Sequence, residues 1–310
     1  MANSALDAVR PADPEAPARS PRRSFGSRVK GGLAAWLPAL PLFFVAGVFL
    51  VLPVFQIIYQ SIHSADTGWT IGFWTDTYSR NSGKRALITS LQLGAVCATI
   101  SLVVGGPLAW LVSRMVRAQR SVWLSLLNVA ANFGGIGLAF AYIAVLGTYG
   151  MLTLGLTDIG IPFVPPSMGS FASLVMAYEY ANIPLYVLLT LPAMSVLRHE
   201  WREAAEVASA TPWQFWRHVG APILAPFLLA GWLLIFTWSV GIYGLAYAMG
   251  ATAAQIGQLN LITLYIGQFL NTGRGKEERA AVMAATLLIL AAVSLGLYRL
   301  IMKRALKWFA

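Results

Sequence analysis

The chain has 310 residues, of which 57% are hydrophobic and only 11% are charged, and its mean hydropathy is +0.66. Because about a quarter of the residues of a soluble domain are charged, this composition excludes an ordinary soluble protein and predicts an all-α integral membrane protein. The single cysteine, Cys97, excludes a disulfide scaffold and a cysteine-rich metal site. The net charge of +10 suggests nucleic acid as a partner, but the placement of the charges argues against it.

The N-terminal part of the chain divides into a polar tail and a first apolar stretch. Residues 1–30 are rich in Pro, Ala, Ser and Arg, which is typical of a disordered tail. The apolar stretch after Lys30 is too long for the core of a signal peptide, so we expect it to be retained in the protein. Residues 31–85 are predicted to form a first transmembrane helix and an external segment, and residues 86–310 a five-helix core with a cytoplasmic loop at 198–222.

Six stretches have the roughly 20 apolar residues that a membrane-spanning helix needs. The third is the least uniform, because two asparagines and a Gly-Gly pair interrupt it. The predicted spans are Leu33–Tyr59, Leu87–Val112, Val122–Leu146, Phe171–Val196, Ile223–Met249 and Ala280–Met302.

The distribution of Lys and Arg predicts the orientation of these spans. Of the 22 basic residues, 16 lie in the tail, in the second-to-third and fourth-to-fifth connections, and at the C-terminal end. The other 6 lie in the connections on the opposite side. Cytoplasmic loops carry the excess of Lys and Arg, so both termini are expected inside. The basic residues are thus explained by topology and anionic membrane lipid rather than by nucleic acid.

The last external connection holds a further apolar segment. Leu259–Leu270 is too short to span a membrane and is predicted to be a re-entrant or interfacial helix.

Glu179, in the fourth predicted span, is the one acidic residue that falls inside a span. A carboxylate inside a membrane is costly, so it usually faces a cavity or a partner. Three explanations remain open at this point: a neutral or snorkelling side chain near the outer interface, a cavity residue that favours a cationic cargo, and packing against a partner chain. If a transport path passes here, its residues are expected to be Glu179 with Tyr178, Tyr180 and Asn182, and Trp238, Tyr243 and Tyr247 of the fifth predicted span.

Residues 198–226 form a charged island between two apolar segments, with signals for two short helices. The first covers Glu203–Ala208, where Arg202 and Glu206 are four residues apart and can pair. Thr211 and Gln214 then form a predicted capping box with Pro212 at the first helical position. The second helix is expected to end at Val219, with Gly220 as its C-cap and Pro222 as a stop.

This island resembles the EAA loop of ABC importer permeases, the membrane subunits of binding-protein-dependent uptake systems. The family pattern is Glu-Ala-Ala, three residues, Gly, nine residues, then Ile-x-Leu-Pro. The chain matches it at Glu203, Ala204, Ala205 and Pro222, and has Ser209, Val219 and Ala221 at the Gly, Ile and Leu positions. The Ser is a departure, because Gly permits a left-handed turn that Ser resists. The YANIPL segment at residues 180–185, followed by Glu-Ala-Ala and then by residues 211–226, looks most like polyamine, iron and thiamine systems.

The resemblance implies the fold and the partners of the chain. It implies a type I importer permease of the bacterial inner membrane, with six transmembrane helices and both termini in the cytoplasm. The implied complex has two ATP-binding subunits that carry the ATP and Mg²⁺, a second permease, expected to be a different chain, and an extracytoplasmic binding protein. The implied ATPase-coupling residues are Glu203, Ala204, Ala205, Ser209, Thr211, Pro212 and Pro222.

Catalytic motifs do not suggest an enzyme. The sequence has no GxxxxGK[ST], HExxH or GxSxG motif and no cluster of His and Cys for a metal, so no catalytic or metal-binding residue and no cofactor is predicted in this chain. The alternative to an ATP-driven permease is a secondary transporter or channel, which inverted repeats or several charges within the spans would favour.

Overall fold

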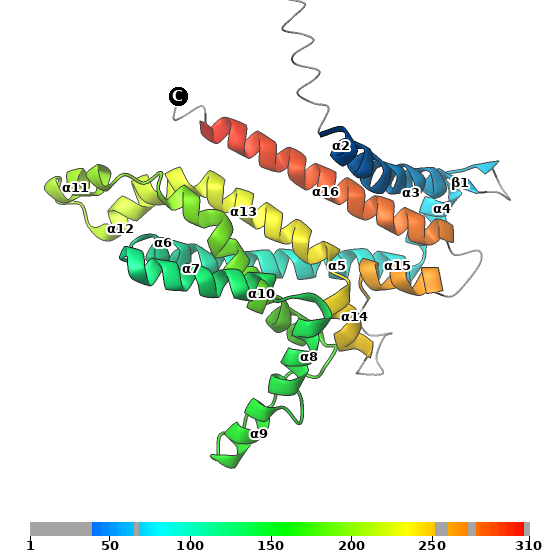
Figure 1. The fold of residues 1–310 in the computed structure, drawn as a ribbon, viewed down its shortest axis with the longest axis horizontal. Helices are drawn as coiled ribbons and strands as arrows, with labels where there is room; N and C mark the ends of the chain where they lie inside the picture. The colour runs from blue at the N-terminus through cyan, green and yellow to red at the C-terminus, as the bar shows by residue number, and fades with distance from the viewer. Residues whose placement is uncertain (1–38, 65–67, 252–259, 272–276, 307–310) are drawn as a thin grey trace, which may run out of the picture. The chain divides into compact units, whose positions relative to one another are not determined.

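The computed structural model describes residues 39–64, 68–251, 260–271 and 277–306 and is almost entirely helical there (Figure 1). A two-stranded antiparallel ribbon, in which His63 pairs with Trp69, is the one sheet in this described part. The elements are α2 Leu40–Ala46, η2 Gly47–Val51, α3 Leu52–Ile62, β1 His63–Ser64, β2 Gly68–Trp69, α4 Gly72–Ser79, α5 Asn81–Ile100, η3 Ser101–Gly105, α6 Gly106–Ser113, α7 Arg117–Asn132, α8 Gly135–Leu146, α9 Met151–Asp158, α10 Phe171–Met194, α11 His199–Val207, α12 Pro212–Phe215, η4 Trp216–Gly220, α13 Ala221–Gly241, α14 Gly244–Ala251, α15 Ile262–Asn271 and α16 Glu277–Leu306.

Six helical runs among the described residues are long and apolar enough to cross a membrane, as the sequence predicted. Several of them are built from consecutive elements, such as α5, η3 and α6. The runs are Leu40–Ile62, Asn81–Ser113, Gly135–Asp158, Phe171–Met194, Pro212–Gly241 and Glu277–Ala305.

The chain divides between Val54 and Phe55 into two units. The described part of the first unit, residues 39–54, belongs to the first apolar helix, which runs without a break from Leu40 to Ile62. The larger second unit is organised around α10 and α13. Helix α13 packs against α5, α10 and α16, while α10 also packs against α6 and α7.

Small residues allow these helices to approach closely around the buried ring of Tyr186 in α10. A Cβ atom at Gly105 would lie 2.8 Å from Tyr186 Cδ1, and one at Gly231 would lie 3.1 Å from Tyr186 Cε2. The Tyr186 hydroxyl donates a hydrogen bond of 2.9 Å to the carbonyl oxygen of Leu228. In membrane proteins, where lipid is as apolar as the helix surface, such close packing and interhelical hydrogen bonds hold helices together.

Each of the three π-helical turns in the described residues ends two residues before a proline. The turns η2, η3 and η4 precede Pro53, Pro107 and Pro222, respectively. Proline has no N–H, and its ring clashes with the carbonyl four residues earlier, which normally kinks or ends a helix. The wider π turn accommodates that misfit, so the helix continues through the proline.

Two of the predicted spans differ from the structure. The third, Val122–Leu146, is not continuous, because α7 ends at Asn132 and the backbone is extended at Phe133 and Gly134 before Gly135 takes a positive φ of 66°. The fifth, Ile223–Met249, breaks near Ile242, whose extended backbone separates α13 from α14. In both places the apolar residues continue through the break, so their pattern does not reveal that the helix ends there.

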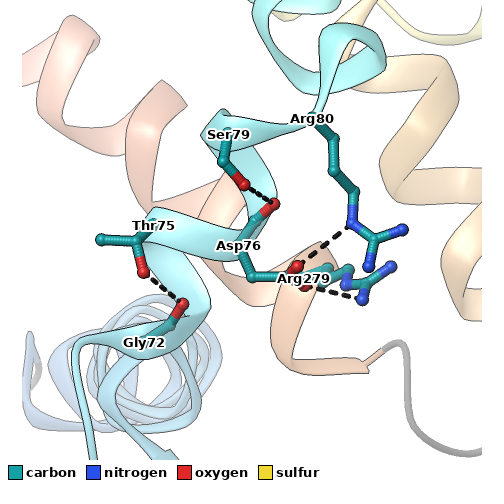
Figure 2. Close-up of polar contacts among 6 residues, drawn as sticks. All are labelled: Gly72, Thr75, Asp76, Ser79, Arg80 and Arg279. Carbon is teal, nitrogen blue, oxygen red and sulfur yellow. Dashed lines mark hydrogen bonds and ion pairs between the residues drawn. The ribbon is translucent and has the colours of Figure 1, made fainter.

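The external segment predicted before the second span is joined to the last span. Figure 2 shows Asp76 of α4 between two arginines, with its Oδ1 atom 3.1 Å from Nε of Arg80 and its Oδ2 atom 2.6 Å from a guanidinium nitrogen of Arg279 in α16. The hydrogen bond from Arg80 and the positive charges of both arginines hold the pKa of Asp76 below its usual value. The hydroxyls of Tyr78 and Thr286 are 2.6 Å apart and add a second link between α4 and α16.

The predicted short segment Leu259–Leu270 also forms a helix. Helix α15 covers Ile262–Asn271 and packs against α16 and α5, while Leu259 lies outside the described residues. Whether α15 is re-entrant or interfacial stays a prediction. The predicted tail at residues 1–30 likewise lies outside the described residues.

Candidate functional site

The charged island forms helices at both places where the sequence predicted them. Helix α11 covers His199–Val207 and is stabilised by an ion pair of 3.0 Å between Arg202 Nε and Glu206 Oε1. At the start of α12, the Thr211 side chain accepts from the Gln214 N–H, and the Gln214 side chain accepts from the Thr211 N–H at 2.8 Å. The capping box and the Arg202–Glu206 pair are therefore confirmed.

Helix α11 ends in the hydrogen-bond pattern of a Schellman motif. The N–H of Ser209 bonds to the carbonyl oxygen of Glu206, and the N–H of Ala210 bonds to that of Ala205, both at 2.9 Å. The motif needs a left-handed residue at the first position past the C-cap, which is usually Gly. Ser209 occupies this position with a φ of 55°, so the turn keeps the geometry for which Gly is suited although the residue is Ser.

A first testable prediction concerns this strained serine. The left-handed conformation costs an L-residue about 1–2 kcal/mol, whereas Gly in place of another residue costs about 0.4–1 kcal/mol through the entropy of the unfolded chain. We therefore expect Ser209→Gly to raise the free energy of unfolding by about 0.5–1 kcal/mol, measured as a higher Tm in detergent. The control is Ala208→Gly at a φ of −76°, which should lower the Tm. A lower Tm for Ser209→Gly would contradict the prediction.

The second helix of the island does not end where the sequence predicted. Gly220 has a right-handed backbone, with φ −64° and ψ −55°, and Pro222 lies inside a helical run that extends from Pro212 to Gly241. The predicted C-cap and stop are therefore wrong. The π turn η4 allows the helix to continue although Pro222 has no N–H to donate. Gly220 makes room for the ring of Trp216, because a Cβ atom at position 220 would lie 2.7 Å from Trp216 Cε3.

The implied coupling residues are accessible on this protrusion. Glu203 and Ala204 are exposed and Ala205 is half-buried, while the Glu203 carboxylate lies 3.0 Å from His199 Nδ1 on the same helix. Thr211 and Pro212 are exposed at the start of α12. The elements α12, η4 and α13 form one helical run from Pro212 to Gly241, so the second helix of the island is continuous with a span.

Three of the four predicted path residues of α10, namely Tyr178, Glu179 and Asn182, lie in a buried polar cluster. Glu179 is 8% exposed, and its Oε2 atom accepts a hydrogen bond of 2.9 Å from Ser101 Oγ in η3. Asn182 is fully buried, and its Nδ2 group donates to Ser239 Oγ in α13 at 2.9 Å. The buried hydroxyl of Tyr178 donates to the carbonyl oxygen of Ile242 at 3.3 Å.

Two acceptor atoms in this cluster, Glu179 Oε1 and Asn182 Oδ1, have no hydrogen bond of ordinary geometry among the described residues, although the Cys97 thiol lies beside the Glu179 carboxylate. Buried polar atoms are rarely left unpaired, so such a pair needs an explanation. The gap beside Tyr178 and Ser239 has no room for a water molecule.

The remaining predicted path residues lie outside the cluster. Tyr180, Trp238, Tyr243 and Tyr247 are 52%, 57%, 38% and 46% exposed. The rings of Tyr243 and Tyr247 stack with centroids 5.2 Å apart, and Tyr180 makes an edge contact with Phe133. Sequence reasoning missed Ser101, a hydroxyl within an apolar run, and gave Ser239 no role beside Asn182.

The chain was compared with known proteins, and no protein-family model matches it. The sulfate transport system permease protein CysW of Synechocystis is 26% identical over 275 residues, which cover 86% of this chain and 92% of that protein. The spermidine/putrescine transport system permease protein PotB of Haemophilus influenzae is 25% identical over 162 residues, which cover 52% of this chain and 57% of PotB.

The fold was also found in a solved transporter. A bacterial ABC transporter involved in the import of the polysaccharide alginate superimposes with a TM-score of 0.63 at 14% identity, covering 91% of this chain and 98% of that one. The chain is therefore similar in sequence to permease proteins of bacterial transport systems and in fold to an ABC transporter. Six apolar helices and this similarity make it a multi-pass protein of the bacterial inner membrane, as predicted.

The similarity to permeases also tests the prediction that a separate subunit, not this chain, hydrolyses ATP. The relatives are permeases by name, so the expectation that this chain is not itself the ATPase is confirmed. The alginate importer has also been solved in complex with a periplasmic protein that carries the alginate oligosaccharide.

Proposed function

We propose that this chain is a membrane subunit of an ATP-driven importer and passes a small solute through the membrane. The observation that carries the proposal is the protruding α11, which presents Glu203, Ala204 and Ala205 on a capped helix joined to a span. A helix of this kind fits a groove on an ATP-hydrolysing subunit, which would supply the ATP and Mg²⁺. Two such subunits, a second permease and an extracytoplasmic binding protein complete the proposed complex.

An uptake assay that identifies the source of energy separates this function from its alternative, a secondary transporter or channel. In proteoliposomes that contain the complete complex, uptake should require ATP inside, and the binding protein with cargo outside. A proton or sodium gradient without ATP should drive no uptake. Uptake that follows the ion gradient and ignores ATP would favour a secondary transporter and refute the proposal.

The proposed orientation places both termini and α11 in the cytoplasm, on the basis of the 16-to-6 distribution of Lys and Arg. Reporter fusions after Lys30, Gln119 and His218 should give a cytoplasmic signal, and fusions after Gly83 and Asp158 an external one. An external signal at His218 would place α11 away from any ATPase and would overturn both the orientation and the coupling role.

For the cargo, we propose a cation such as a polyamine. Glu179 Oε1 and Asn182 Oδ1 are both acceptors without a hydrogen bond of ordinary geometry among the described residues, and an ammonium group offers only donors. The relatedness to PotB is compatible with this proposal. The second candidate is an oxyanion, which the relatedness to the sulfate permease CysW favours. Uptake of labelled polyamine and of labelled sulfate by the same complex distinguishes them.

A further inference from the structure

A cleft in the second unit is lined by residues of α6, α7, α10, α11, α12 and η4 and of the segments that connect them. Its volume is about 580 Å³, within the usual range for small-molecule sites. The cleft is separate from the buried Glu179 cluster, because none of its lining residues belongs to that cluster. Two of the implied coupling residues, Ala205 and Pro212, line the cleft, whereas Glu203 does not, and the coupling role does not account for the arginines of the lining.

Four arginines line the cleft and come from three different parts of the chain. Arg114 follows α6, Arg120 belongs to α7, Arg198 is the N-cap of α11 and Arg202 lies within α11. Glu206 is the one acidic residue in the lining, and it is already paired with Arg202. The lining therefore has a clear excess of positive charge.

The guanidinium of Arg114 is held in place although it has no acidic partner among the described residues. Its Cζ atom lies 4.5 Å from the ring centroid of Trp110, which in turn packs against Trp216 with centroids 5.4 Å apart. Partial burial and the nearby positive charge of Arg202 lower the pKa of Arg114. A guanidinium that stacks on an indole ring near a second guanidinium is suited to binding phosphate through paired N–H groups.

The lining of the cleft also contains apolar residues. Leu191 and Met194 line it at the end of the span Phe171–Met194, and Trp110 lies near the end of the span Asn81–Ser113. A ligand with a negatively charged head and an apolar remainder can contact both the basic and the apolar residues of the lining. The cleft also lies at the ends of two spans, where lipid headgroups are found.

We propose that this cleft is a binding site for a phosphate-bearing anion, with the headgroup of an anionic phospholipid as its source. The placement of the site at the cytoplasmic leaflet rests on the proposed orientation, whereas anion binding itself does not. Binding is therefore measured without transport, so a failure of this inference is distinguishable from a failure of the importer proposal.

The test uses the purified complete complex, exchanged into equal amounts of phosphatidylglycerol and phosphatidylcholine, with bound lipid identified by native mass spectrometry. The parent should retain phosphatidylglycerol preferentially. The double variant Arg114→Gln/Arg202→Gln should lose this preference by about tenfold or more. The variant Arg120→Gln/Arg198→Gln changes two exposed positions and should also lower the preference for phosphatidylglycerol. It keeps the inference testable if the first variant does not fold.

The matched control is Arg117→Gln/Arg217→Gln, which removes the same charge from neighbouring positions outside the cleft. Its preference for phosphatidylglycerol should stay within about twofold of the parent, because distant exposed charges are screened. Calorimetric titration with inorganic phosphate in phosphatidylcholine separates the two sources. Binding of phosphate that the cleft variants lose would support the site with a free anion as its ligand.

Two outcomes would overturn the inference. In the first, the control variant loses phosphatidylglycerol as strongly as the cleft variants do, which would indicate general surface charge. In the second, all variants and the parent behave alike both in the lipid exchange and in the phosphate titration. This result is expected if an ATPase subunit covers the cleft in the complex.

Discussion

Replacing Glu203 with Lys is expected to abolish coupled transport while the protein still reaches the membrane. Glu203 is exposed on α11 and contacts only His199 of the same helix in the described structure, so the substitution leaves the fold intact. In the proposed complex the side chain faces an ATPase subunit. Loss of a central interface residue costs about 2 kcal/mol or more, equivalent to roughly thirtyfold in affinity. Uptake should fall accordingly, whereas the amount of protein in the membrane should not.

The control for this prediction is Glu200→Lys, which makes the same charge change one turn earlier on α11. Glu200 is exposed and lies outside the Glu-Ala-Ala segment. Its replacement should cost about 0.3–1 kcal/mol of helix stability through the helix dipole and leave uptake near the parent level. Ala205→Phe should reproduce the Glu203→Lys defect, because a bulky side chain prevents close approach. Normal uptake by both Glu203→Lys and Ala205→Phe would show that α11 does not dock an ATPase.

Much of the coupling island could be predicted because its signals are local. Thr211, Pro212 and Gln214 specify a capping box through contacts within four residues, and the structure confirms it. Ser209 is instructive in the opposite sense. The sequence indicated that Ser resists a left-handed turn, yet the hydrogen bonds to Ala205 and Glu206 impose that conformation. The local preference of one residue was overcome by the requirements of the turn.

The wrong predictions arose where a residue type has two roles that sequence alone does not separate. Gly220 followed by Pro222 is the usual signal for the end of a helix. Here the glycine accommodates the ring of Trp216 and the proline follows a π turn, so the helix continues to Gly241. The position of a π turn depends on packing and hydrogen bonding over a full turn, and periodicity of apolar residues does not reveal it.

The buried cluster around Glu179 could be predicted only in part. The isolated carboxylate in an apolar span identified α10 as functionally interesting, and Asn182, three residues later, lies on the same face. Their partners Ser101 and Ser239 come from η3 and α13, far away in the sequence. A lone serine in a span carries no distinguishing pattern, so only the packing of the three helices reveals that these groups meet.

Replacing Glu179 with Gln is expected to abolish transport of the native cargo while the complex still assembles. The substitution preserves size, and the new carboxamide oxygen can still accept the hydrogen bond from Ser101. It removes the negative charge and turns one acceptor into a donor. If a cation passes this cluster, loss of its buried charge partner costs about 2–5 kcal/mol, at least roughly thirtyfold in affinity. Uptake of labelled polyamine in proteoliposomes measures the effect.

The control is Ser101→Ala, which removes the hydrogen bond to Glu179 but keeps the carboxylate. A neutral side-chain hydrogen bond contributes about 0.5–1.5 kcal/mol and one to a charged group about 1.5–3 kcal/mol, so this variant should lower the Tm more than it lowers uptake. Glu179→Gln should show the reverse pattern, a nearly unchanged Tm with little uptake. If Glu179→Gln transports as well as the parent, the carboxylate serves only packing. If it loses uptake of sulfate instead, the cargo is an anion, and Glu179 acts by shaping the path rather than by attracting charge.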